Sequence, residues 1–154
     1  MPKKSKPATS ADAQVVLQLY DFRREAEMRK ARNFVASFSP KSVEDMVNLA
    51  MAFGTPENAW MRQVFTYWDM AACLALRGAI HPGLAFDTLG EMWFVYAKVK
   101  PFIKEYRQKM GVPEAFANIE KFVEGTPEGR QRLKMMQERM ARFADRFAKA
   151  KAAD

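Results

Sequence analysis

The fold is decided in the stretch PENAWMRQVFTYWDMAACLALR, which covers residues 56–77. Its bulky and small apolar side chains recur every three or four positions, which places them on one helical face; they are Trp60, Val64, Tyr67, Trp68, Ala71 and Ala75. Helix punctuation stands at both ends, because Thr-Pro suits a first turn and Gly78 suits the position after a last one. We therefore predict a helix from Pro56 to Arg77 with a wide apolar face.

Similar punctuation divides the rest of the chain into helices, and strand signals such as alternating β-branched runs are weak throughout. The predicted helices cover residues 10–38, 42–53, 56–77, 84–110, 114–124 and 127–152. Ser39-Pro40 ends the first helix, because a residue before proline avoids helical geometry. Ser42 and Asp45 resemble a capping box that opens the second. Pro101 predicts a kink in the fourth.

These elements predict an all-α protein with about six helices in an antiparallel helical bundle. Because no linker rich in proline, glycine or serine divides the chain, we expect a single helical domain over residues 10–154. The basic residues 1–9 are expected to form a disordered tail ahead of it. The length of 154 residues suits one domain.

The tetrapeptide Gly-Thr-Pro-Glu occurs twice, at residues 54–57 and 125–128. Its glycine suits a left-handed helix end, and its threonine and proline suit the cap and first turn of the next helix. Its glutamate suits the positive end of the helix dipole. We interpret both copies as helix punctuation and not as a phosphate-binding loop.

Composition excludes several kinds of site. A single cysteine, Cys73, excludes an internal disulfide and a cysteine-based zinc cluster, and a single histidine, His81, excludes paired-histidine metal motifs. Asp87 and Glu91, four residues apart, would make only a weak metal site without histidines. No nucleotide fingerprint or hydrolase motif is present. We therefore predict no catalytic residues, no metal and no cofactor, and we expect Cys73 to pack as a small apolar residue.

The positive charge of the chain lies at its two ends. Of the net charge of +7, residues 130–154 hold +5, residues 1–6 hold +3, and the residues between hold −1. Basic ends are more typical of solubilising tails than of a nucleic-acid interface, which shows its charge on the folded surface. No apolar run is long enough for a signal peptide or a membrane span, so the sequence predicts a cytoplasmic protein.

One arginine of the first helix is predicted to face the core. Stripes at helical spacing include either Arg23 or Arg24, and an unpaired buried guanidinium is costly. Asp69 and Glu91 lie among apolar residues of other helices and are candidate partners. Two interpretations stay open: a structural ion pair, or a pocket for a small anion or other small molecule formed by Arg23, Arg24, Asp69 and Trp93.

The last helix carries an apolar stripe with the spacing of a coiled-coil seam: Leu133, Met136, Met140, Phe143, Phe147 and Ala150. Arg132, Arg139 and Arg146 flank it at equivalent positions. Pairing this seam with a second copy of itself would not place opposite charges together. We therefore expect the stripe to pack on its own domain or on an acidic partner, with the three arginines as partner-binding residues.

Three segments carry a resemblance to a known family: Leu19-Tyr20-Asp21-Phe22-Arg23-Arg24-Glu25, Gly78-Ala79-Ile80, and the series Trp93, Pro101, Ile103, Arg107. Over about residues 15–110 the chain resembles small bacterial all-helical proteins classed as a domain of unknown function. The resemblance implies a helical fold and no established activity, so it transfers no catalytic role.

The sequence favours a non-enzymatic helical module that binds protein, either a second copy of itself or an acidic partner. Its eleven methionines are consistent with adaptable contacts. Two alternatives stay open. The basic ends predict salt-sensitive binding to nucleic acid or another polyanion, and the arginines of the first helix predict a small-ligand pocket between helices.

Overall fold

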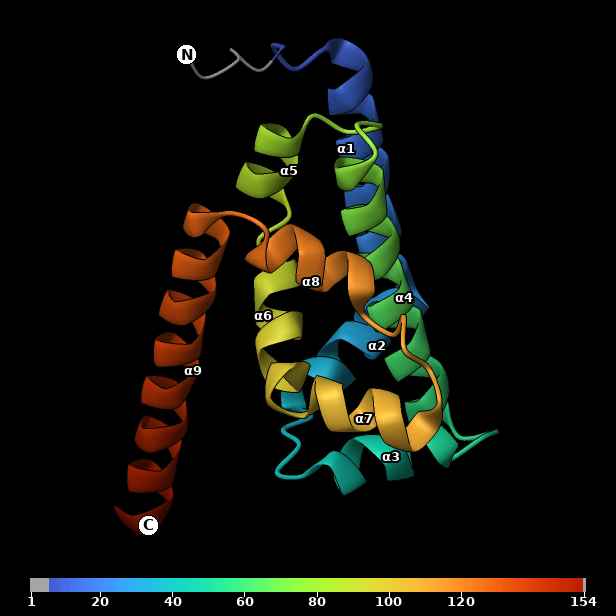
Figure 1. The fold of residues 1–154 in the computed structure, drawn as a ribbon. Coiled ribbons are helices and arrows are strands. Elements are labelled where there is room, and N and C mark those ends of the chain that lie inside the picture. The colour runs from blue at the N-terminus through green and yellow to red at the C-terminus, as the bar shows by residue number, and fades with distance from the viewer. Residues whose placement is uncertain (1–5, 154) are drawn as a thin grey trace.

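The computed structural model describes residues 6–153, with side chains described up to residue 146. Over this range the backbone forms helices and turns and no strand, which confirms the all-α class (Figure 1). The elements are α1 (Ser10–Arg24), α2 (Ala26–Ser37), α3 (Val43–Met51), α4 (Pro56–Leu76), α5 (Pro82–Thr88), α6 (Glu91–Val99), the 3-10 turn η1 (Lys100–Phe102), α7 (Ile103–Met110), α8 (Ala117–Glu124) and α9 (Pro127–Ala153). The predicted basic tail falls partly outside the described residues, and residues 6–9 precede α1 without regular structure.

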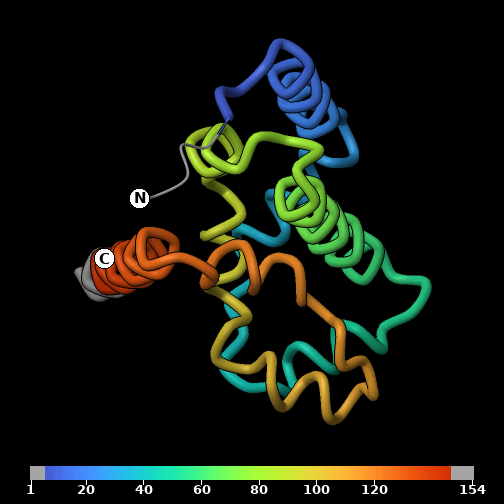
Figure 2. Tube along the Cα trace, turned by 45° about the horizontal axis from the view of Figure 1, so that its top comes forward, coloured from blue at the N-terminus to red at the C-terminus, as the bar shows by residue number. Residues whose placement is uncertain are grey.

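Helix α4 lies at the centre of the packing, as its apolar face predicts. It contacts α2, α3, α5 and α8, and Figure 2 shows it in green, running along the right-hand side of the molecule. The largest fully buried side chains include Trp68 of α4 and Trp93 and Tyr96 of α6. Buried Asn58 donates hydrogen bonds of 2.9 Å to the carbonyls of Leu49 and Ala50, which ties the start of α4 to the end of α3.

The single helix predicted over residues 10–38 is wrong in one respect, because it breaks at Glu25 into α1 and α2. Glu25 has φ −57° and ψ 143°, which is an extended conformation outside the helical region. Its carboxylate accepts a hydrogen bond of 2.9 Å from the backbone N–H of Met28, caps α2 and has a lowered pKa for that reason. A glutamate side chain thus starts the second helix within a continuous helical sequence pattern.

The stretch predicted as one kinked helix over residues 84–110 contains three helices and a turn. The first of these helices, α5, begins at Pro82, before the predicted start. His81 caps it, because its Nδ1 atom accepts a hydrogen bond of 3.2 Å from the Leu84 backbone N–H. The chain leaves helical hydrogen bonding after Thr88 and resumes it at Glu91. Pro101 lies in η1, between α6 and α7, where its missing N–H removes one helical hydrogen bond.

The two Gly-Thr-Pro-Glu copies start helices in the same way but use their glycines differently. Gly54 has φ 82°, the predicted left-handed conformation. Gly125 has φ −67°, so the left-handed geometry predicted for it is wrong. A Cβ atom at Gly125 would lie 2.3 Å from the Lys121 carbonyl oxygen, so this position requires glycine for space. In both copies the threonine side chain accepts a backbone N–H from the first turn of the following helix.

Helix α9 lies on the outside of the molecule in both views (Figures 1 and 2). It packs mainly on α6 and α8, and its C-terminal half extends away from the other helices (Figure 1). We call α1–α8 the body. Among residues 6–153 no helix is both long and apolar enough to cross a membrane.

A buried lysine closes the end of α2. The Lys98 ammonium group donates hydrogen bonds to the carbonyl oxygens of Ala36, at 3.0 Å, and Phe38, at 2.8 Å. It also lies 4.7 Å from the centre of the Phe94 ring. Burial, together with the positive charge of Lys41, lowers the pKa of Lys98 to about 8. The Lys98 ammonium group therefore loses its proton more readily in the folded protein than in the unfolded chain.

We predict that wild-type stability relative to a Lys98→Met variant increases as pH rises from 7 to 9.5. The pKa of Lys98 is about 8 in the folded protein and its ordinary value is 10.5, so the unfolded chain binds more protons between these pH values. The free energy of unfolding therefore rises with pH. The expected gain is about 1–2 kcal/mol. Urea unfolding of both proteins at the two pH values measures it, and tyrosine titrations cancel in the difference. An unchanged gap would contradict the lowered pKa.

Candidate interaction surface

The carboxylate of Glu91 joins three helices. Glu91 is the first residue of α6. Its carboxylate accepts hydrogen bonds from Arg23 Nη2, at 2.5 Å, and from Arg32 Nη2 and Nε, at 2.6 and 2.9 Å. Arg23 lies at the end of α1 and Arg32 lies on α2. Burial alone would raise the pKa of Glu91, but the hydrogen bonds and positive charges of the two arginines outweigh it and lower that pKa. This cluster clamps the α1–α2 break onto α6.

Arg23 is therefore the inward arginine, and Arg24 is exposed. The Arg23 guanidinium lies 5.2 Å from the Trp68 ring and 5.9 Å from the Tyr20 ring, which provides cation–π contacts. Within the described residues, the buried Nε atom of Arg23 has no hydrogen-bond acceptor. The predicted pairing of an inward arginine with Glu91 is present, and Arg32 adds a second cation to it.

Asp69 is used for a different purpose. Its carboxylate accepts hydrogen bonds from the backbone N–H groups of Asn118, at 3.0 Å, and Ile119, at 3.1 Å, and from the Asn118 side-chain amide, at 2.7 Å. Helix α8 begins after Phe116, which has φ 60° and a side chain that cannot accept a hydrogen bond. Asp69 of α4 thus caps α8 from a neighbouring helix and places negative charge at its positive end.

Trp93 and Arg132 hold the start of α9. The buried Trp93 indole Nε1 donates a hydrogen bond of 3.0 Å to the Gly129 carbonyl oxygen. The Arg132 guanidinium lies 4.4 Å from the Trp93 ring and 4.9 Å from the Phe86 ring, and it donates a hydrogen bond to the Phe86 carbonyl oxygen. Burial lowers the pKa of Arg132, although the charge of Asp87 opposes the shift.

The four residues of the predicted small-ligand pocket take part in separate arrangements. Arg23 belongs to the Glu91 clamp, Arg24 faces outward, Asp69 caps α8 and Trp93 anchors α9. Of the three arginines predicted to bind a partner, Arg132 packs on the body, whereas Arg139 and Arg146 are exposed. The structure therefore separates residues that the sequence analysis grouped.

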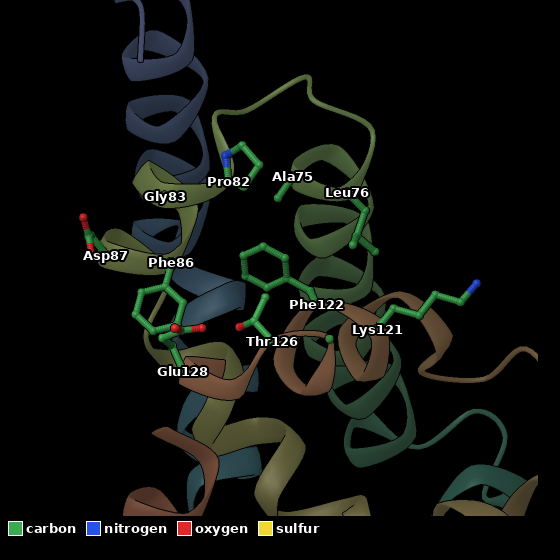
Figure 3. A pocket seen from close by; sticks show the side chains of 11 residues that line it. Ala75, Leu76, Pro82, Gly83, Phe86, Asp87, Lys121, Phe122, Thr126 and Glu128 are labelled. Atoms are coloured by element: carbon green, nitrogen blue, oxygen red, sulfur yellow. The ribbon is translucent and has the colours of Figure 1, made fainter. Parts of the chain in front are cut away.

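A groove lies beside the first turn of α9 (Figure 3). It has a volume of about 520 Å³ and is bounded by the ends of α4 and α8 and the starts of α5 and α9. We call it the root groove; the lining residues used below are Leu76, Pro82, Phe86, Phe122, Thr126 and Glu128. Phe86 and Phe122 meet the Trp93 ring edge-on, with centroids 5.1 and 5.7 Å away. Figure 3 labels Glu128 and Phe86 among the residues that line the groove.

The apolar stripe of α9 loses its cover along the helix. Leu133 is only 3% exposed, Met136 and Met140 are half-buried, and Phe143 is 47% exposed. Arg139, Arg142 and Arg146 surround Phe143 and form a hollow of about 250 Å³ with it. The Arg139 guanidinium lies 5.6 Å from the Phe143 ring. We call residues 139–146 the α9 tail; Phe147 and Ala150, the last members of the predicted stripe, lie outside the residues with described side chains.

Three structural residues were not predicted from the sequence: Arg32, Lys98 and the body-packed Arg132. Arg32 was not considered beside Glu91, although it directly follows the fully buried Ala31 on α2. Lys98 lies in an apolar run, which could have indicated burial. Arg132 was predicted to bind a partner because its heptad position matches that of Arg139. The heptad pattern does not show how far along α9 the other helices cover it, so the packing of Arg132 on the body could not be predicted.

The chain matches the family described as Domain of unknown function (DUF4760) over residues 8–126. The matched range ends one residue before α9 begins. No curated protein and no solved structure matches the chain.

We predict that a Glu91→Gln variant is less stable than wild type by about 1–3 kcal/mol. The substitution leaves two guanidinium groups beside a neutral amide, and loss of one member of a largely buried ion cluster exposes the remaining charges to an uncompensated desolvation cost. The clamp is partly exposed, with 19% of the Glu91 side chain accessible, which keeps the effect below that of a fully buried pair. Urea-induced unfolding followed by tryptophan fluorescence measures the change.

Two neighbouring arginines supply the control. Arg24→Met should alter stability by less than about 0.5 kcal/mol, because exposed positions tolerate substitution, whereas Arg23→Met should destabilise the protein measurably. Equal effects of the two substitutions would show that the clamp does not stabilise the fold.

Proposed function

The chain belongs to the DUF4760 family of domains of unknown function, and we propose that it is a non-enzymatic protein-interaction module whose contact element is the α9 tail. The observation that carries this proposal is the partial cover of the α9 stripe. A stripe with the spacing of a packed helix face continues past the body, where Phe143 is 47% exposed. Exposed apolar surface rimmed by polar groups is typical of a binding site.

The charge around Phe143 indicates the chemistry of the partner. Arg139, Arg142 and Arg146 are exposed, and no salt bridge joins any of them to another described residue. Guanidinium groups bind carboxylates through paired hydrogen bonds. A partner surface with an apolar contact for Phe143 and carboxylates around it would satisfy both features.

The position of α9 supports the same proposal. Trp93 and Arg132 fix its first turns on α6 and α5, so the tail projects from a rigid base. A preorganised contact element loses less conformational freedom on binding than a flexible segment does. Because α9 lies outside the matched range, the contact element is a feature that this chain carries beyond the family domain.

We predict that the chain binds a labelled acidic helical peptide of about 20 residues with glutamates three or four positions apart and leucines between them. Reversing Arg139, Arg142 and Arg146 to glutamate should weaken this binding at least about tenfold, since three attractive charge pairs become repulsive. Fluorescence anisotropy at 0.15 M and 0.5 M salt measures the affinity, which should decrease at the higher salt concentration.

A matched control reverses three exposed cations of the body, Arg24, Arg77 and Lys104, which changes the net charge by the same amount. This control should retain the wild-type affinity within about twofold. Equal losses in the two variants would show that only net charge matters. Tighter binding of a DNA duplex than of the peptide would favour the nucleic-acid alternative over the proposed function.

A further inference from the structure

The root groove has the properties that the α9 tail requires of a partner. Its walls are apolar and include the rings of Phe86 and Phe122. Exposed Glu128 lines the groove together with Phe86 (Figure 3), and exposed Asp87 follows Phe86 on α5 and also lines the groove. A side chain that fills such a groove should be aromatic or aliphatic, and the side chains beside it should be cationic.

The α9 tail presents this combination. Phe143 supplies an exposed ring, and Arg142 and Arg146 stand beside it on the same part of the helix. The tail cannot reach the groove of its own chain, because the groove lies at the start of α9 and the tail lies farther along the same helix (Figure 1). Glu128 and Phe143 are fifteen residues apart on it, which corresponds to a rise of about 22 Å. A second copy of the chain is therefore the occupant that the molecule itself specifies.

A two-fold axis makes this exchange reciprocal. When two α9 helices lie antiparallel with the axis midway between residues 135 and 136, residue 143 of each copy is level with residue 128 of the other. Met135, which is 60% exposed, then lies at the axis against its symmetry mate. Closed two-fold contacts of this kind use one surface twice and are the commonest form of self-association.

We propose that two copies of this chain pair through antiparallel α9 helices, with Phe143 of each copy in the root groove of the other and Arg142 and Arg146 beside its Glu128. The proposal rests on the proposed function, in which the α9 tail is the contact element, and it names the partner. It also differs from a coiled coil of two apolar seams, because it sets arginines against a glutamate and leaves Arg132 packed within its own body.

Sedimentation equilibrium of the full chain tests the proposal. We expect a monomer–dimer equilibrium that weakens when salt is raised from 0.1 M to 0.5 M. The double variant Arg142→Glu/Arg146→Glu and the single variant Glu128→Arg should each weaken dimerisation at least about tenfold. The chain that carries all three substitutions should recover most of the wild-type affinity, because its charges are opposite again. This recovery also shows that the substitutions leave the fold intact.

Lys134→Glu is the matched control, since Lys134 is exposed on α9 and lies about a quarter turn from Met135, off the proposed contact face; its dimerisation constant should stay within about twofold of wild type. Disulfide trapping tests the register. In a Cys73→Ser background, a Glu128→Cys chain mixed with a Phe143→Cys chain should form a crosslinked heterodimer faster than either chain crosslinks with itself.

A wild-type monomer at millimolar concentration, or a dimer unaffected by Glu128→Arg, would overturn this inference. If the acidic peptide still binds the α9 tail in that case, the proposed function stands and the partner is another protein. If the peptide also fails to bind, the proposed function and the inference fail together.

Discussion

The anchoring of α9 by Trp93 and Arg132 is the constraint on which the exposed surface depends. One indole N–H bonds the Gly129 carbonyl, and one guanidinium stacks on the Trp93 and Phe86 rings while it bonds the Phe86 carbonyl. These contacts fix the start of a helix that runs to Ala153, and the body covers the apolar stripe of that helix only as far as the half-buried Met140. The direction of the tail is therefore decided by groups near its start, and the tail is exposed because the body ends.

Charged side chains inside the body act mainly between helices. Glu91 joins α1, α2 and α6, Asp69 caps α8 from α4, and Lys98 closes α2 from α6. Short helices have many unpaired backbone groups relative to their length. A fold built from several short helices therefore needs polar groups from neighbouring helices to satisfy those ends. This requirement accounts for partly buried ions that would otherwise suggest a binding pocket.

The sequence predicts those parts of the fold that local chemistry controls. The helix over Pro56–Arg77, the capping box at Ser42 and the left-handed Gly54 are all present. The break at Glu25 was missed because glutamate favours helix interiors, and only the packing of Arg23 and Arg32 around Glu91 makes an interruption favourable there. Likewise, Gly125 looks identical to Gly54 in sequence, yet it is required by the closeness of the Lys121 carbonyl oxygen in the last turn of α8 and not by a left-handed conformation. Spacing limited the inward arginine to Arg23 or Arg24 and its acidic partner to Asp69 or Glu91, but it could not choose within these pairs or tell that Asp69 and Trp93 serve other helices.

Arg132 and Arg139 occupy equivalent positions of one heptad pattern and have different surroundings, because the difference lies outside α9. Beside Arg132 stand two aromatic rings and a free carbonyl at the end of α5, so burial of the guanidinium is compensated by stacking and hydrogen bonding. Beside Arg139 the described neighbour is the Phe143 ring of its own helix. Cations that flank an exposed apolar ring disfavour indiscriminate association, since like charges on two copies repel when the rings approach face to face. In the proposed interaction, the same arginines would therefore favour surfaces that offer carboxylates and would make the exposed stripe selective.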